Sequence, residues 1–246
     1  EGQPRDGAAA ARSGILWTPF QKSKTSNMPL RQGFVHVEAS IFKMLTQAVD
    51  NAISIGWFTA YKFFNSLFLG LSIGSIFVIY TPLSPAVFSA GGIGLALGTL
   101  VIATQYQKLF TARWFFSLSF VVELTILLGV IAVLVYPVDT FLALFVYVGY
   151  QFSFAFGSYL VRCETLLIGD KKALTHLDIA KQVGYLVGMA CAWGFYEALE
   201  NGHGVTDKLP QVQAMHWPLV VVELAIILLL ICAFKKLWRS APNLPE

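Results

Sequence analysis

The chain has 246 residues, of which 56% are hydrophobic and 13% are charged, and its mean hydropathy is +0.65. Soluble domains carry roughly 25% charged residues, so this composition excludes a water-soluble enzyme and indicates a protein solvated by lipid. The net charge of +3 is dispersed, and no cluster of Lys and Arg occurs that would neutralise a phosphate backbone, so a nucleic-acid partner is excluded as well.

The N-terminal part of the chain divides into two regions of different composition. Residues 1–27 begin without a methionine and contain Ala-rich and Ser/Thr-rich pieces, which indicates a flexible leader, a linker or a remnant of cloning. In residues 28–62 apolar side chains recur every three to four positions. They are Phe34, Val37, Ile41, Phe42, Leu45, Val49, Ile53 and Trp57. This pattern predicts an amphipathic helix that lies on the membrane surface or packs against its own protein.

Six uncharged or weakly charged apolar stretches follow, and each is a candidate membrane span because about 20 apolar residues cross the hydrocarbon core of a bilayer. The expected spans are 63–80, 85–104, 114–136, 141–161, 182–196 and 217–234. The first can extend back to Ile53. Residues 240–246 remain as a short cytoplasmic tail. The predicted fold class is therefore all-α, a polytopic membrane protein whose transmembrane bundle occupies residues 63–239.

The distribution of basic residues predicts the orientation of these spans. Sixteen of the seventeen Lys and Arg residues fall in the N-terminal segment, in the loops after the second and fourth spans, or in the tail, and Lys208 is the exception. Because cytoplasmic loops retain positive charge, we expect a multi-pass protein with six spans and both termini in the cytoplasm.

Matches between spans indicate an internal repeat. Residues 121–126 (VVELTI) agree with residues 221–226 (VVELAI) at five of six positions, and both contain a glutamate. A G-x-x-x-G pattern, which lets helices approach closely, occurs in the second span and again in the fifth. Its glycines, the candidates for helix packing, are Gly94, Gly98, Gly184 and Gly188. With three spans per copy, the second copy is inverted relative to the first, as in many transporters.

This arrangement resembles half of a major facilitator superfamily transporter, which consists of two inverted three-span units with cytoplasmic ends and charged loops after the second and fourth spans. The resemblance covers about residues 63–239 and lies in topology, because the loop 105–113 (QYQKLFTAR) has neither the Gly nor the Asp of the family's signature. It implies a membrane transport protein that pairs with another chain to enclose a pathway.

Glu123 and Glu223 are the candidate residues of a substrate or proton pathway. A charged carboxylate in hydrocarbon costs about 3 kcal/mol or more, so such residues usually face a bundle interior or a water-filled cavity. Burial favours the protonated form, which suits a proton-coupled carrier. The alternative is a neutral carboxyl group that hydrogen-bonds between helices and ties the two repeats together. No Lys or Arg lies inside a predicted span to pair with either glutamate.

The densest polar run supplies four candidate residues for a cytoplasmic gate of exchangeable salt bridges. They are Arg162, Glu164, Asp178 and Lys181. Asp178 and Lys181 are three residues apart and share a helix face. The alternative is that these side chains are solvated charges at the membrane surface, in accordance with the positive-inside rule.

The sequence shows no motif of a hydrolase or a phosphate-binding loop, so we expect no enzyme and no cofactor. Its four histidines are scattered and make no plausible metal set. We predict a membrane transport or permeation protein for a small solute or ion, embedded in the bilayer and acting as a homo-oligomer or with other membrane subunits. The alternative is a structural or assembly subunit of a larger membrane complex, and a lipid-binding protein comes third.

Overall fold

The computed structural model describes residues 53–239, and within that range all regular structure is helical. The long helices are α2 (Ile55–Ile79), α3 (Pro85–Thr104), α5 (Ala112–Val135), α6 (Thr140–Ile168), α7 (Lys171–Glu197) and α8 (Lys208–Ala233). Two short helices, α4 (Tyr106–Leu109) and α9 (Lys235–Arg239), and a π-helical turn η1 (Ala198–Gly202) complete them. The expected leader 1–27, most of the region 28–62 and the tail 240–246 lie outside the described residues.

Five of these helices, namely α2, α3, α5, α6 and α8, are long and apolar enough to cross a membrane. The prediction of an all-α, multi-pass membrane protein is confirmed to that extent. Helix α7 has a comparable length, but it carries four charged side chains in its first eleven residues and is not among the five.

Several helices are longer than the apolar stretches that predicted them. Helix α2 begins at Ile55, so its first eight residues do not belong to a separate surface helix as the sequence suggested. Helix α7 begins at Lys171, where Asp170 caps the helix by accepting a hydrogen bond of 2.9 Å from the Ala173 amide. Helix α8 begins at Lys208 and continues through Pro218. Capping groups and backbone bonding set helix ends, whereas hydropathy reports only the apolar part.

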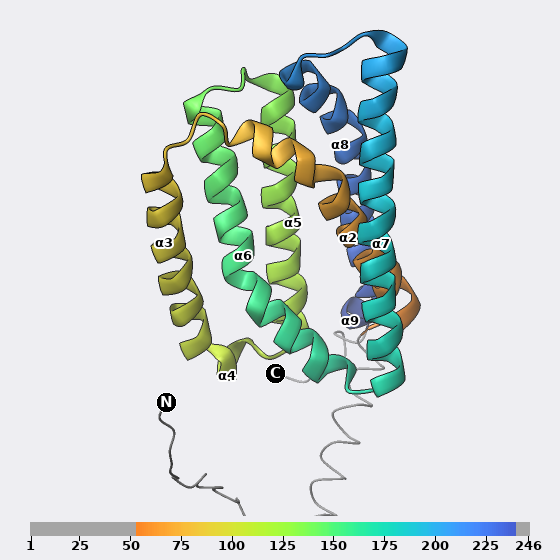
Figure 1. Cartoon of the computed structure of the whole chain (residues 1–246). Helices are drawn as coiled ribbons and strands as arrows, with labels where there is room; N and C mark the ends of the chain where they lie inside the picture. Colours follow the sequence, from red (N-terminus) through yellow and green to blue (C-terminus); the bar gives the residue numbers. More distant parts are fainter. Residues whose placement is uncertain (1–52, 240–246) are drawn as a thin grey trace, which may run out of the picture. The chain divides into compact units, whose positions relative to one another are not determined.

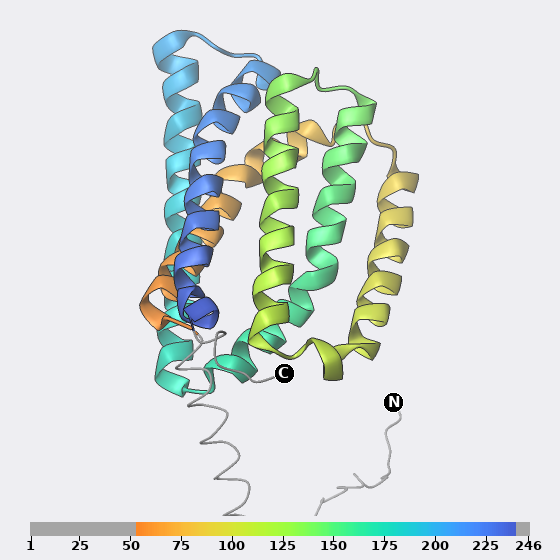
Figure 2. The ribbon, with the colours of Figure 1, turned by 180° about the vertical axis from the view of Figure 1, so that it is seen from behind.

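Successive long helices run in opposite directions, so the connections alternate between the two ends of the bundle (Figure 1). Helices α3 and α7 lie at opposite edges, and both views show α2 inclined against the other helices (Figure 2). Helix α2 packs on α7 and α8, α5 packs on α8 and α6, and α3 packs mainly on α6.

The core lies around α2, α5 and α8, and α3 contributes little to it. The rings of Phe58, Phe115 and Phe234 pack together, with centroids 5.7 to 6.1 Å apart. In contrast, no residue of α3 is buried. The side of α3 that does not touch α6 is therefore an apolar surface for lipid or another protein.

Close helix contact through glycine occurs between α2 and α7. A Cβ atom at Gly184 would lie 2.3 Å from the Phe63 carbonyl oxygen, and one at Gly188 would lie 2.2 Å from the Leu67 carbonyl oxygen. Gly70 of α2 faces Gly188 from the other side. The two predicted packing glycines of α3 differ, since a Cβ atom at Gly94 would meet nothing within 4 Å and one at Gly98 would make only an ordinary contact. Gly91 of α3 does approach closely, but to the Tyr147 ring of α6. The close approach predicted at Gly94 is thus not made with any residue of the described range 53–239.

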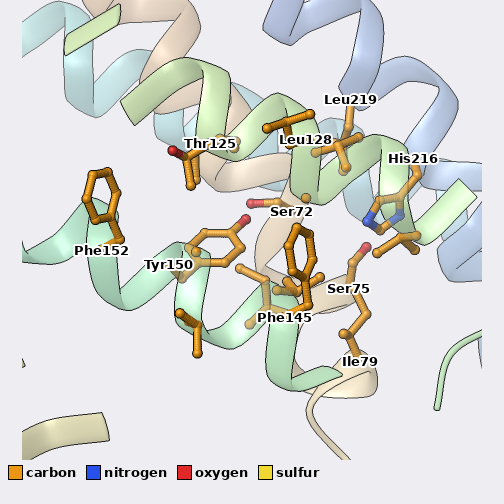
Figure 3. Close-up of a pocket in the computed structure, with 18 residues that line it drawn as sticks. Ser72, Ser75, Ile79, Thr125, Leu128, Phe145, Tyr150, Phe152, His216 and Leu219 are labelled. Carbon is orange, nitrogen blue, oxygen red and sulfur yellow. The ribbon is translucent and has the colours of Figure 1, made fainter. Parts of the chain in front are cut away.

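A cavity of about 330 Å³ lies between α2, α5, α6 and α8, in the half of the bundle away from α9 (Figure 3). Its wall is mainly apolar. The exceptions are four hydroxyl side chains and one imidazole, which belong to Ser72, Ser75, Thr125, Tyr150 and His216. The cavity is therefore an apolar space with a few polar groups in its wall.

Candidate functional site

Glu123 and Glu223 lie in the middle of the bundle, where α5 packs against α8. Their exposed fractions are 2% and 0%. The two carboxyl groups interact electrostatically with each other. Two glutamates that are one hundred residues apart in the sequence therefore form one buried acidic pair, which we call the carboxyl pair.

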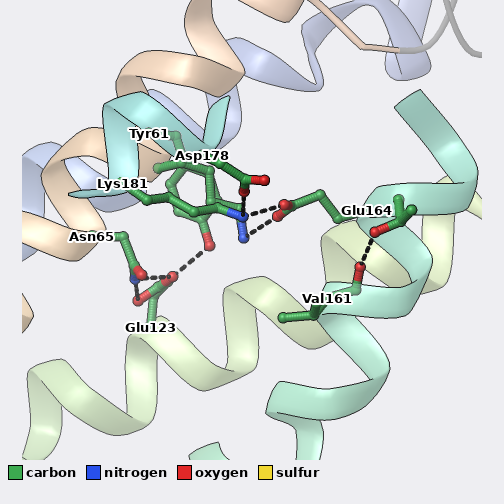
Figure 4. Close-up of polar contacts among 9 residues, drawn as sticks. Tyr61, Asn65, Glu123, Val161, Glu164, Asp178 and Lys181 are labelled. Carbon is green, nitrogen blue, oxygen red and sulfur yellow. Dashed lines mark hydrogen bonds and ion pairs between the residues drawn. The ribbon is translucent and has the colours of Figure 1, made fainter. Parts of the chain in front are cut away.

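The two members of the carboxyl pair differ in their hydrogen bonds. The Tyr61 hydroxyl donates to Glu123 Oε1 at 2.6 Å, and the Asn65 amide nitrogen donates to the same carboxyl group at 3.1 and 3.3 Å (Figure 4). No donor group among the described residues bonds to either oxygen of Glu223, and its polar neighbour is the carboxyl group of Glu123, which needs a proton before the two can form a hydrogen bond. Because an unsatisfied buried carboxyl group is costly, Glu223 requires a proton, a water molecule or a ligand to complete it.

A second cluster of charges lies nearer the end of the bundle at which α6 ends and α7 begins. Glu164 is 3% exposed and forms ion pairs with Lys62 at 2.8 Å and with Lys181. Lys181 also contacts Asp178 at 3.3 Å (Figure 4). The structure therefore brings Glu164, Asp178 and Lys181 together, as the hypothesis of a salt-bridge cluster requires.

Arg162, the fourth candidate residue of the gate, is not part of this cluster. Its side chain is exposed and lies over the ring of Tyr106, with 5.7 Å between the guanidinium carbon and the ring centroid. Arg162 and Glu164 are two positions apart, and on a helix that spacing points side chains to different faces. Arg162 is therefore an exposed cation that contacts the Tyr106 ring and points away from Glu164.

Lys62 is the functional candidate that the sequence analysis missed. Helix α2 begins at Ile55, in agreement with the extension of the first span toward Ile53, so Lys62 lies inside it, with only 9% of its surface exposed. Its ammonium nitrogen lies 5.2 Å from the centroid of the Tyr61 ring and interacts electrostatically with Glu123. The expectation that no basic residue accompanies the glutamates is therefore wrong. The sequence signal for this site was the polar set Tyr61, Lys62 and Asn65, which lie within about one turn of the same helix.

The two clusters and the cavity follow one another along the bundle as a series of polar groups. It starts at the exposed Asp178, passes through Lys181, Glu164 and Lys62, and reaches Tyr61 and the carboxyl pair. Beyond Glu223, with which it interacts electrostatically but forms no hydrogen bond, Tyr150 points its hydroxyl toward Ser72 in the cavity (Figure 3). Polar side chains thus connect one end of the bundle with a cavity in its other half.

Metal ligation is not indicated by this arrangement. No group of three or more His, Cys, Asp and Glu side chains that could hold a metal ion is present in residues 53–239. His216 lies in the cavity wall, where its Nδ1 donates to the Val212 carbonyl oxygen at 2.7 Å. The three cysteines are free thiols. What the arrangement can do chemically is bind and exchange protons and pair charges.

Comparison with protein family models, with curated proteins and with solved structures gave no match to this chain. Its function is therefore inferred from its own residues.

Proposed function

We propose that the protein moves protons across a membrane, alone or coupled to a small solute, with the carboxyl pair as the central proton-binding group. The observation that carries this proposal is the polar series from Asp178 through the carboxyl pair to the cavity. Such a series is expensive in hydrocarbon, and intramembrane acids with defined partners are typical of ion and proton pathways.

The local chemistry supports exchange of a proton at this pair. Two carboxylates that share a buried site repel each other, so one proton between them relieves a large electrostatic cost. Lys62 acts electrostatically on Glu123, and its ammonium group is held by the ion pair with Glu164 at 2.8 Å. A change in the ion pairs of Lys62 would therefore change the affinity of Glu123 for a proton.

The six-span topology with cytoplasmic termini belongs to the same proposal. Helix α7 packs along α2 and is as long as the five apolar helices, so it crosses the same distance. Its Lys181 is neutralised by Glu164 and Asp178, which lowers the cost of placing that side chain near the membrane. Among the described residues, Lys208 is the basic side chain at the end where α8 begins, and the connections at the other end hold Lys108, Arg113, Lys171 and Lys172.

The contacts between helices support two inverted three-helix units, α2–α3–α5 and α6–α7–α8. If α2 is exchanged with α6, α3 with α7 and α5 with α8, the α2–α7 interface becomes the α6–α3 interface. The α2–α8 interface becomes the α6–α5 interface, and the α5–α8 interface maps onto itself. All of these interfaces occur in the bundle. The carboxyl pair lies at the interface that maps onto itself, as a pair of equivalent residues would.

Proton flux into proteoliposomes tests the proposed function. The full chain is reconstituted with a pH-sensitive dye inside the vesicles, and a potassium diffusion potential set with valinomycin drives protons inward. We expect acidification faster than in protein-free liposomes, and we expect E123Q and E223Q each to reduce it to the protein-free rate. The variant E197Q, which changes an exposed glutamate at the far end of α7, is the matched control and keeps the flux.

Two outcomes contradict the proposal. One is a wild-type rate equal to that of protein-free liposomes, although the protein is folded and incorporated. The other is an undiminished rate in both carboxyl variants. A subunit that only supports assembly predicts the first outcome for the wild type. It also predicts that E123Q and E223Q impair formation of the complex.

We propose assembly with further membrane helices as the second candidate, and the surface of α3 favours it. Helix α3 buries none of its residues, and its exposed side includes Ile93, Leu97 and Gly94, with open space above the glycine. A small residue with open space allows another helix to approach closely. Cysteine cross-linking at Leu97 in native membranes tests this idea, and a monomer with no cross-linked product contradicts it.

A further inference from the structure

The cavity between α2, α5, α6 and α8 has a side open toward the surface of the bundle that lipid covers. Three of its lining residues are themselves exposed on the outside, Leu128 by 60%, Val148 by 56% and Phe145 by 48%. They belong to α5 and α6, both apolar enough to span a membrane. The mouth of the cavity therefore faces the hydrocarbon layer.

A shallow groove of about 580 Å³ continues from this mouth along α5 and α6. It shares Leu128 and Phe145 with the cavity and ends at Tyr136 and Asp139, where the two helices connect. The groove thus leads from the ends of the helices, at the level of the polar headgroups, down to the cavity mouth. A molecule dissolved in the bilayer can reach the cavity along this apolar surface without crossing the bundle.

The polar groups at the inner wall offer hydrogen-bond acceptors. The Thr125 hydroxyl donates to the Val121 carbonyl oxygen at 2.9 Å, and the Ser72 hydroxyl donates to the Leu69 carbonyl oxygen at 3.2 Å. Their protons are therefore occupied, while their oxygens can still accept. His216, which is 4% exposed, uses Nδ1 as the donor to Val212, so in the neutral ring Nε2 is an acceptor. No partner for Nε2 occurs among the described residues.

The wall also restricts the charge and size of an occupant. None of the residues described as lining the cavity carries a formal charge at neutral pH when His216 is neutral. An ion bound there without a partner would lose its hydration at a high cost, so the occupant is uncharged. A volume of about 330 Å³ lies at the lower end of the range of small-molecule pockets.

We propose that this cavity binds a small, uncharged molecule dissolved in the bilayer, with an apolar body and one O–H or N–H donor that is bound by His216 Nε2. In this proposal the apolar body lies against Leu128, Phe145 and Val148, and the donor points inward to His216. Figure 3 shows Leu128, Phe145 and His216 around the cavity. This inference deepens the proposed function by naming the class of solute that shares the pathway, and its test does not require transport.

Binding of 1-naphthol and naphthalene to the full chain in lipid nanodiscs tests the inference. The two probes have the same apolar rings, and only the first has a hydroxyl donor. Empty nanodiscs give the non-saturable background of partitioning into lipid. We expect saturable binding of 1-naphthol to the protein, and binding of naphthalene weaker by about tenfold because the hydrogen bond is missing.

Three variants make the test specific. Gly129 lines the cavity, and a Cβ atom there meets nothing within 4 Å, so G129L fills the space without a clash and abolishes the binding of both probes. Gly157 of α6 has the same open surroundings but does not line the cavity, so G157L is the matched control and binds 1-naphthol normally. H216F removes the acceptor and makes the affinities for the two probes equal.

The inference is overturned if wild-type binding does not saturate, if G129L binds 1-naphthol as well as G157L does, or if H216F still distinguishes the two probes. These outcomes are independent of the flux measurement. Saturable, G129L-sensitive binding without proton flux retains the cavity inference and refutes the proposed function, whereas flux without binding does the reverse.

Discussion

The α2–α7 interface and the α3–α6 interface are equivalent under the proposed repeat, yet the two are built differently. On the α2–α7 side glycines bring two backbones into contact, and the buried Lys62 is paired nearby with Glu164. On the α3–α6 side no residue of α3 is buried, and its Gly94 meets open space.

This difference indicates which part of the bundle is rigid and which part is free to contact lipid or another chain. Close backbone packing and paired buried charges favour one arrangement of helices, because any shift leaves an ion unpaired or a carbonyl oxygen in a clash. On the α3 side no ion pair is formed among the described residues, and the one close glycine contact, of Gly91, is with the Tyr147 side chain and not with a backbone. We infer that the first interface fixes α2, which carries Tyr61 and Lys62, and that the second adapts to lipid or to another chain.

The largest effect is expected when the paired charges on the α2–α7 side are broken. E164A leaves Lys62 buried without its partner, and we expect a loss of about 3–5 kcal/mol in the free energy of unfolding. D178N, which removes an exposed partner of Lys181, should change stability by less than about 1 kcal/mol. Unfolding by denaturant in mixed micelles measures both, and equal losses would show that the burial of Lys62 has no energetic consequence.

The next effect concerns the glycine contact. G188L places a side chain against the Leu67 carbonyl oxygen, so α2 and α7 must separate, and we expect a loss of about 3 kcal/mol. Thermal unfolding in detergent is the measurement. A melting temperature like that of the wild type would mean that the two helices do not approach as closely as described.

A smaller effect is expected from removal of single hydroxyl groups, one that joins α2 to α5 and one that joins α6 to α3. Y61F removes the donor to Glu123 and leaves a buried acceptor with fewer partners, which costs about 1–3 kcal/mol. Y147F removes a longer bond of 3.3 Å from Tyr147 to the Phe88 carbonyl oxygen of α3 and should cost less than about 1 kcal/mol. The same unfolding assay measures both variants. An equal loss in the free energy of unfolding for Y147F and Y61F would contradict the expected difference between the two hydrogen bonds.

The smallest effect is expected on α3 itself. G94L projects into open space and removes a glycine from a helix, so the stability of the monomer changes by less than about 1 kcal/mol. Analytical ultracentrifugation in detergent, run beside thermal unfolding, separates the monomer from assembly. A strongly destabilised monomer would contradict the description of α3 as a free surface.

The sequence predicted the helices best where charge is absent. The bounds of α3 agree with the predicted stretch 85–104, because prolines before it and polar residues after it mark both ends. The start of α7 was misplaced by eleven residues, because hydropathy treats Asp178 and Lys181 as the edge of the membrane. Their neutralisation depends on Glu164 of another helix, and no local pattern reports such a contact.

The candidate site was predictable in part for the same reason. The repeated context of Glu123 and Glu223 singled out both residues, but their meeting across α5 and α8 is a property of packing. Lys62 was missed because it contacts Glu164, one hundred and two positions further along the chain. The Gly70-x-x-x-Gly74 pattern of α2 was visible in the sequence and could have identified the helix that meets Gly188.

The measurement that tests the central claim most directly is infrared difference spectroscopy of the reconstituted protein during a change of pH, in H₂O and in D₂O. If the carboxyl pair exchanges protons with the aqueous phase, the wild type shows a protonated-carboxyl band that shifts in D₂O. That band is lost in the double variant E123Q/E223Q and kept in E197Q. A band that does not respond to pH or to D₂O, or one that persists in the double variant, would contradict the account.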